Sequence, residues 1–125
     1  MMNFGIEHVL ILSKDTKALV EWYVKVFDWE VVSDNGQGTY LVKAANGNML
    51  EFGLSDVEGK DPLNATGFRH LAICVDDFEE AVQKVREAGV PGLKDPVVAE
   101  DGFGIMFFED IDGNPVHLVK RPVAL

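Results

Sequence analysis

Hydrophobic positions along the chain repeat with two different periods, and the same order of periods occurs twice. Residues 7–12 and 69–75 are apolar runs of strand length. Acidic or hydroxyl residues that suit a helix N-cap follow each run, at 13–16 and at 76–77. The next apolar residues recur at the spacing of one buried helix face. They are Leu19, Val20, Tyr23, Val26 and Phe27 in the first half, and Phe78, Ala81, Val82, Val85 and Ala88 in the second.

After each predicted helix the period changes to that of strands. The strands expected are 29–32, 39–42 and 49–52 in the first half, and 97–99, 105–108 and 116–119 in the second. Asn-Gly and Asp-Gly pairs between them predict tight turns, because both residues tolerate positive φ. The chain is therefore predicted to be one α+β domain over residues 1–125. It consists of two β-α-β-β-β modules, 1–54 and 67–121, joined by a polar linker at 55–66.

Composition narrows the possible partners. The formal net charge is -10, from 21 acidic and 11 basic residues, so the field of the protein disfavours nucleic acids and anionic membranes. The single cysteine, Cys74, excludes an internal disulfide and a multi-cysteine zinc site. Neither a signal-peptide pattern nor an apolar run of about 18 residues occurs. We expect a cytoplasmic protein whose partner is a small molecule.

The three histidines occupy repeat-equivalent positions. His8 aligns with His70, and His117 aligns with Glu51. Because strand side chains alternate between faces, all four residues lie opposite the aliphatic residues expected to pack under the helices. A pseudo-two-fold relation between the modules would bring them together as ligands of one divalent metal, since imidazole and carboxylate suit Zn, Ni, Co, Fe or Mn. The alternative is that each is an isolated, hydrogen-bonded strand residue.

Three further residues are candidates for a substrate pocket. Arg121 has the same strand parity as His117 and could hold a substrate carboxylate, or it could be a solvated terminal residue. Cys74 shares parity with His70 and could line the cavity, although the preferred interpretation is a small buried apolar residue. Phe103 lies between Gly102 and Gly104, where it could be a lid or could anchor a loop.

Several of these residues resemble the vicinal oxygen chelate superfamily, which includes glyoxalase I, bleomycin-resistance proteins and extradiol dioxygenases. The resemblance is carried by His8, Glu51, segment 67–73 and segment 107–119 with its Asp-Gly-Asn turn. It implies a glyoxalase-like fold, in which a curved mixed sheet with helices on its convex face surrounds one divalent metal. The substrate would present two neighbouring oxygens to that metal. One departure is His117, because glyoxalase I-like members carry a glutamate at that position.

The resemblance implies a metal-dependent, glyoxalase-like isomerase or lyase that acts through a metal-bound enediolate on a small oxygenated substrate. His8, His70 and His117 would hold Ni, Zn or Co, and Glu51 would be both a ligand and the base. Two alternatives stay open: an Fe(II) extradiol-type dioxygenase, and a metal-independent sequestering protein of the bleomycin-resistance type. We also expect a homodimer, because paired modules of this size leave edge strands exposed. The sequence is compatible with a metal site within one chain or shared across a dimer.

Overall fold

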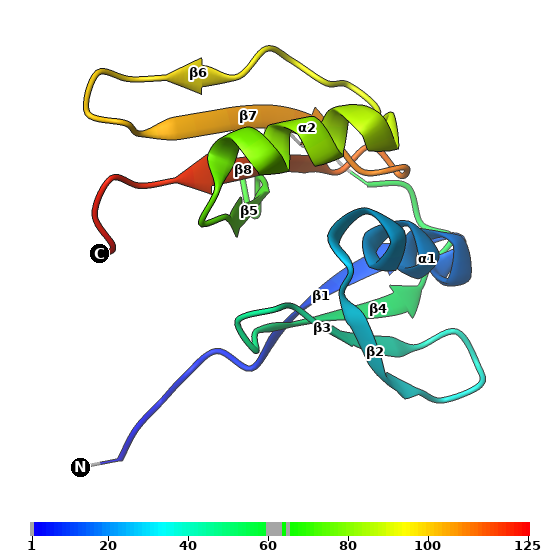
Figure 1. Ribbon diagram of the computed structural model, residues 1–125. Helices are drawn as coiled ribbons and strands as arrows, with labels where there is room; N and C mark the ends of the chain where they lie inside the picture. The colour runs from blue at the N-terminus through cyan, green and yellow to red at the C-terminus, as the bar shows by residue number, and fades with distance from the viewer. Residues whose placement is uncertain (1, 60–63, 65) are drawn as a thin grey trace. The chain divides into compact units, whose positions relative to one another are not determined.

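The computed structural model describes residues 2–59, 64 and 66–125 (Figure 1). The chain divides into two compact units, Met1–Glu58 (unit 1) and Gly59–Leu125 (unit 2), and each is described here by itself. Each unit holds one four-stranded mixed sheet and one helix, which confirms the α+β class and the two β-α-β-β-β modules. The division falls inside the predicted linker 55–66, of which residues 60–63 and 65 lie outside the described residues.

Unit 1 follows the order strand, helix and three strands. Its elements are β1 (His8–Ser13), α1 (Thr16–Phe27), β2 (Glu30–Asp34), β3 (Tyr40–Lys43) and β4 (Met49–Leu54). The strands lie in the order β1-β4-β3-β2. Tight turns make β2, β3 and β4 antiparallel, whereas β1, which precedes the helix, pairs with β4 in parallel.

Unit 2 repeats this topology. Its elements are β5 (Leu71–Cys74), α2 (Phe78–Ala88), β6 (Val97–Val98), β7 (Gly104–Glu109) and β8 (Pro115–Lys120). The strand order β5-β8-β7-β6 is equivalent to that of unit 1, with β5 parallel to β8. The first strand is shorter than predicted, and His70 directly precedes it rather than lying within it.

The predicted helix N-caps are confirmed in both units. Asp15 accepts a hydrogen bond from the backbone N–H of Ala18, and Asp77 accepts one from the N–H of Glu80, each at 3.1 Å. These bonds satisfy N–H groups that have no partner within the helix. Gly89 ends α2 in the left-handed conformation, which glycine adopts readily.

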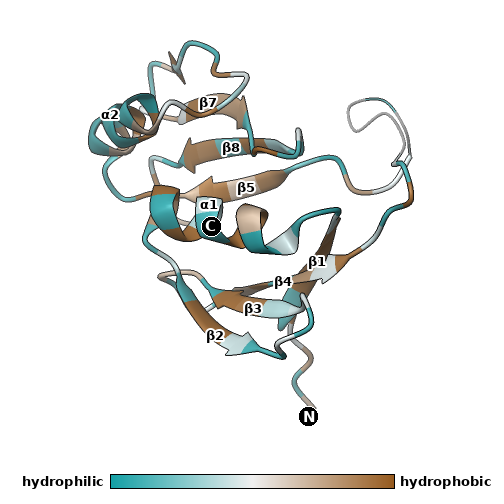
Figure 2. Cartoon of the chain, turned by 90° about the vertical axis from the view of Figure 1, so that its right-hand side faces the viewer, coloured by the Kyte–Doolittle hydropathy of each residue, from teal (hydrophilic) through white to brown (hydrophobic). Residues whose placement is uncertain are grey.

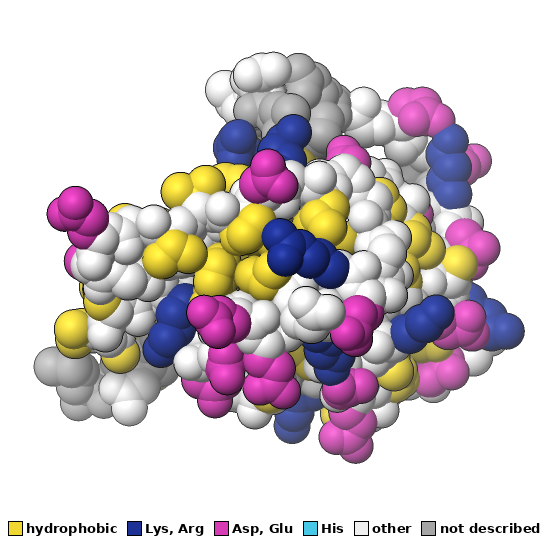
Figure 3. Space-filling view, turned by 45° about the horizontal axis from the view of Figure 1, so that its top comes forward, with side chains coloured by type: hydrophobic (Ala, Val, Ile, Leu, Met, Phe, Trp, Pro, Cys, Tyr) yellow, Lys and Arg dark blue, Asp and Glu magenta, His cyan; other side chains and the backbone are white. Residues whose placement is uncertain are grey.

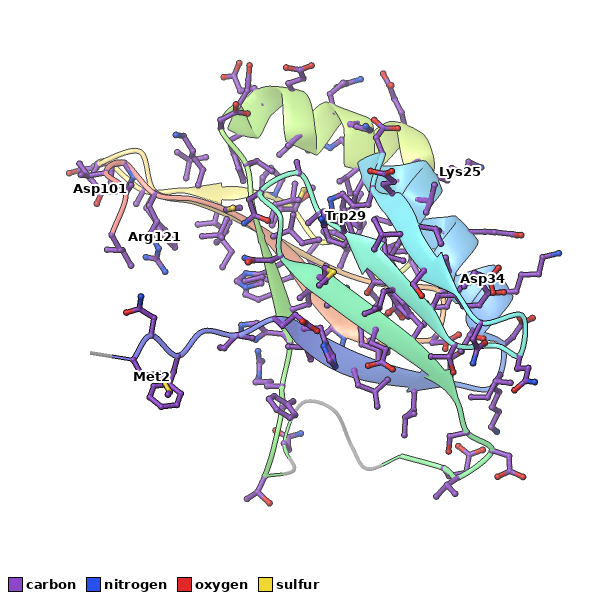
Figure 4. The ribbon with its side chains drawn as sticks, turned by 90° about the horizontal axis from the view of Figure 1, so that it is seen from below. Met2, Lys25, Trp29, Asp34, Asp101 and Arg121 are labelled. Atoms are coloured by element: carbon purple, nitrogen blue, oxygen red, sulfur yellow. The ribbon has the colours of Figure 1, made fainter. Side chains whose placement is uncertain are left out.

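Each helix covers one face of the sheet in its own unit. In unit 1, Tyr23 of α1 and Phe52 of β4 are fully buried, with ring centroids 5.4 Å apart. Trp29 stacks on Tyr23 from beside the helix (Figure 4). The strands consist largely of hydrophobic residues, whereas the helices contain both hydrophobic and hydrophilic residues (Figure 2). Burial on the helix-covered face leaves the opposite face of each sheet available for polar side chains.

In unit 2, the buried face carries Met106, Val116 and Leu118 beneath α2. Gly104 permits this packing, because an added Cβ would lie 3.0 Å from the ring of Phe78, the first residue of α2. Among the described residues, neither helix is long and apolar enough to cross a membrane.

The Asp-Gly-Asn segment has a structural role as the turn between β7 and β8. Asp110 is fully buried and accepts hydrogen bonds from the backbone N–H groups of Asp112 and Asn114, and from Asn114 Nδ2. Gly113 has a φ of 84° in this turn, which a residue with a side chain rarely adopts. The turn sets the register that pairs β7 with β8.

Candidate metal centre

Unit 1 brings His8 and Glu51 into direct contact. The register pairs Leu10 with Glu51 and His8 with Met49, so His8 is a diagonal neighbour of Glu51 across β1 and β4. His8 Nε2 lies 2.8 Å from Glu51 Oε2. The two side chains are 35% and 28% exposed, so both remain accessible to a small ligand. They lie on the face of the sheet opposite the buried Phe52, as the alternation of strand residues predicts.

Glu7 supplies a second carboxylate to His8. His8 Nδ1 donates a hydrogen bond to Glu7 Oε1 at 2.9 Å. A carboxylate bonded to one ring nitrogen of a histidine fixes its orientation and directs the other nitrogen toward a metal or a second acceptor. The sequence interpretation missed Glu7. Its position directly before the candidate ligand His8 was the signal that could have identified it.

Unit 2 brings the other two histidines together. His70 precedes β5, and His117 lies in β8, where it pairs in register with Ala72. The centroids of the two imidazole rings are 4.4 Å apart with an interplanar angle of 75°. Phe107, the cross-strand neighbour of His117, stacks on it with centroids 5.0 Å apart and planes within 7°. Phe107 is a second residue that the sequence interpretation missed, because its role depends on the strand register.

His117 is buried, and its polar atoms are not satisfied. Its exposed fraction is 7%, and neither Nδ1 nor Nε2 has a hydrogen-bond partner in the part of the chain that the structure describes. Burial lowers the pKa of the His117 imidazole, and electrostatic repulsion from the direction of His70 and Arg69 lowers it further. The ring is therefore held neutral, with a lone pair on one nitrogen, which is the form that binds metals. A buried polar group without a partner costs free energy, so a ligand on that nitrogen would supply the missing interaction.

Arg69 contacts His70 as Glu7 contacts His8, but with the opposite polarity. Arg69 Nη1 lies 3.1 Å from His70 Nδ1. Because a guanidinium only donates hydrogen bonds, His70 accepts at Nδ1. The two histidines therefore have different electrostatic surroundings even though they occupy equivalent positions in the repeat.

The four predicted ligands thus occur as two pairs, His8 with Glu51 and His70 with His117, one pair in each unit. Their imidazole and carboxylate groups suit Zn, Ni, Co, Mn or Fe. Among the described residues, no group of three or more His, Cys, Asp or Glu side chains is arranged so that it could hold a metal ion. Neither pair by itself supplies the three or four protein ligands of a typical zinc site.

The three candidate pocket residues all lie in unit 2. The guanidinium carbon of Arg121 lies 5.5 Å from the centroid of the Phe103 ring, so these two residues form a cation–π pair. Cys74 is an exposed free thiol, so the interpretation of this cysteine as a small buried residue is wrong. Its register partner in β8 is Val119, which has the same strand parity as His117.

At the surface, basic side chains are interspersed with acidic ones (Figure 3).

Comparisons with known proteins agree with this architecture. The family model of the Glyoxalase/Bleomycin resistance protein/Dioxygenase superfamily matches residues 5–118. The uncharacterized protein YwkD of Bacillus subtilis (strain 168) is 30% identical over 131 residues, which span 97% of this chain and 100% of YwkD.

Two solved structures are also similar. The glyoxalase family protein from Enterococcus faecalis has a TM-score of 0.72 and 30% identity, with 92% of this chain and 96% of that chain covered. A mutant of the fosfomycin resistance protein FosX from Listeria monocytogenes, complexed with Mn(II) and a dihydroxypropylphosphonic acid, has a TM-score of 0.72 and 18% identity. The match covers 94% of this chain and 90% of that chain, and at this identity it shows the fold alone. Since the family match spans nearly all of both modules, the resemblance seen in the sequence is confirmed, and the chain belongs to the Glyoxalase/Bleomycin resistance protein/Dioxygenase superfamily.

Proposed function

We propose that this protein is a metal-dependent, glyoxalase-like isomerase or lyase that acts on a small oxygenated substrate. The observation that carries the proposal is the state of His117, which is buried, neutral and without a partner for either ring nitrogen. The adjacent His70 ring supplies a second imidazole donor. The buried His117 ring is costly unless a ligand binds to it, and a divalent metal is the ligand that imidazole chemistry suits.

The complete metal site would combine the two pairs. His8 and Glu51 would supply two ligands, and His70 and His117 would supply the other two. The pairs would meet within one chain or between two chains of a homodimer. Exposed apolar residues on the edge strand β1 support the homodimer, because Leu10 is 49% exposed and Leu12 is 56% exposed.

Glu51 is the residue that would move the proton. A bound divalent metal would supply Lewis-acid polarisation of two neighbouring substrate oxygens. Glu51 carries an accessible carboxylate, and its contact with His8 Nε2 holds Oε2 in place. Its role would be to take a proton from the carbon next to the polarised carbonyl and to return it to the neighbouring atom. His8 would keep its orientation through the hydrogen bond from Nδ1 to Glu7.

Metal analysis of protein purified without added metal tests this proposal. We expect about one nickel, cobalt or zinc ion per complete set of four ligands in the wild type. His70→Ala should lose most of this metal, because the substitution removes one of the four ligands. The matched control is Gln37→Ala, an exposed residue of the β2–β3 turn, which should keep the metal.

Other outcomes would change the assignment. Iron in the wild type would favour the dioxygenase, since two histidines and one carboxylate suit Fe(II) chemistry. Wild-type protein that binds none of these metals, even when they are supplied in excess, would contradict the proposal and favour a sequestering protein.

A further inference from the structure

One face of unit 2 carries a graded series of side chains that leads away from the histidines. Phe107 of β7 pairs with His117 of β8, and the next pair with the same parity is Ile105 with Val119. One further step along both strands reaches Phe103 and Arg121, which are in cation–π contact. The series therefore runs from imidazole, through aliphatic groups, to guanidinium.

Arg121 is held in place, and no anionic side chain among the described residues forms an ion pair with it. Its guanidinium stacks on the Phe103 ring, and this arrangement leaves the N–H groups at its edge free to donate. Arg121 takes part in none of the ion pairs formed by the described residues, although the chain has 21 acidic residues. Asp101, at the same end of unit 2 (Figure 4), instead accepts a hydrogen bond from the backbone N–H of Phe103 at 2.9 Å.

The spacing between the two ends sets the size of a ligand that would reach both. Four residues of extended chain separate His117 from Arg121, which places their Cα atoms about 13 Å apart. Ile105 and Val119 are half-buried between them and give an apolar surface. The side chains of His117 and Arg121 take up part of this Cα–Cα distance, so a ligand needs to span only the remainder. A ligand with a short apolar segment between its two polar ends matches this surface.

We propose that Arg121, positioned by Phe103, recognises a carboxylate on the substrate. The substrate class is then an acid in which an apolar segment separates the carboxylate from two neighbouring oxygens. The oxygen-binding end of this assignment rests on the proposed function, whereas the carboxylate end rests on Arg121 alone. With a net charge of -10, the protein repels anions over most of its surface, so a fixed cation is needed to bind an acidic substrate.

Two synthetic ligands that differ only in charge test this assignment. The probe is 3-(3,4-dihydroxyphenyl)propanoate, which has neighbouring hydroxyls, a short apolar segment and a carboxylate, and the reference is its neutral amide. Titration calorimetry at low ionic strength with zinc-loaded protein should show that the wild type binds the acid at least about tenfold more tightly than the amide, because charge-assisted hydrogen bonds are strong. Arg121→Gln should remove this preference and leave the affinity for the amide unchanged.

Controls separate a specific contact from a general effect of charge. Arg86→Gln, in the last turn of α2, loses the same charge and should keep the preference for the acid. Phe103→Leu should weaken the preference, because the stacked ring no longer fixes the guanidinium. An Arg121→Gln variant that keeps the preference, or a wild type that shows none, would overturn the assignment of Arg121.

Repeating the titrations with EDTA distinguishes a wrong assignment of Arg121 from a failure of the proposed metal-dependent function. If zinc strengthens the binding of both ligands but the acid is not preferred, Arg121 is assigned wrongly and the metal-dependent function stands. If the preference for the acid depends on Arg121 but neither affinity changes with zinc, the carboxylate site stands and the metal-dependent function fails.

Discussion

Glu7 and Arg69 precede equivalent histidines, yet they form hydrogen bonds of opposite polarity with them. His8 donates from Nδ1 to Glu7, whereas His70 accepts at Nδ1 from Arg69. At the scale of single residues the duplicated modules have therefore diverged beside the candidate ligands. The pair in unit 1 combines an imidazole with accessible carboxylate groups, while unit 2 holds two imidazoles near a cation. Among the four candidate ligands, only Glu51 can act as a carboxylate base.

Replacing Glu51 with glutamine tests that role directly. Glu51→Gln keeps a side-chain oxygen and the shape of the residue, so the variant should keep much of the metal. Exchange of the carbon-bound protons of dihydroxyacetone in D2O should fall at least about 100-fold, because the amide cannot accept the proton. NMR of the ligand measures the exchange.

Glu79→Gln in α2 is the matched control for this experiment, and it should exchange protons at the wild-type rate. Undiminished exchange in Glu51→Gln would remove Glu51 from the mechanism.

Secondary-structure elements position these residues through strand register and helix packing. In each unit the helix buries one face of the sheet, and the candidate ligands lie on the other. In unit 2 the approach of α2 to β7 depends on Gly104, which leaves space for the ring of Phe78. This contact supports β7, which carries Phe107 and directly follows Phe103, so the packing beneath the sheet also orders the face above it.

Gly104→Ala tests the contact between α2 and β7. The new Cβ would lie 3.0 Å from the Phe78 ring, closer than ordinary van der Waals contact, so the ring or the strand must shift. We expect a loss of about 1–3 kcal/mol in the free energy of unfolding, measured by urea denaturation. Gly5→Ala is the control, because an added Cβ meets nothing within 4 Å there, and it should leave stability unchanged. Equal stability of the two variants would show that the contact is not tight.

At the scale of the whole molecule, two similar units each hold one pair of the candidate ligands. Duplication explains this arrangement, because equivalent positions in the modules give equivalent places on the two sheets. Neither pair has enough ligands for a four-coordinate metal, so metal affinity should depend on both units. A metal that binds only the assembled site would stabilise the folded state by mass action.

Removal of the metal tests this dependence. EDTA should lower the Tm of the metal-loaded wild type by several degrees, because the folded state loses a bound ligand. The same treatment should leave the Tm of His8→Ala and of His117→Ala unchanged, since each variant lacks one half of the site. Differential scanning calorimetry measures the shifts. If His8→Ala retains the full response to EDTA, unit 1 takes no part in metal binding.

Much of the fold could be predicted from the sequence, because it depends on local periodicity and on turn chemistry. The helix caps at Asp15 and Asp77 and the strand order of each module follow from patterns that repeat along the chain. The pairing of His8 with Glu51 also follows from strand parity within one module. The role of Phe107 could not be predicted in this way, because it depends on the precise register of β7 and β8 and on side-chain rotamers.

By itself the sequence determined the duplicated β-α-β-β-β architecture and the faces on which the candidate ligands lie, since hydrophobic alternation is a local property. The tertiary structure decided which polar atoms find partners. It buried His117 against His70 and Phe107 and left both of its ring nitrogens unbonded, exposed Cys74, and stacked Arg121 on Phe103. These features arise where segments distant in the chain pack together, and burial and hydrogen bonding depend on all the surrounding atoms at once.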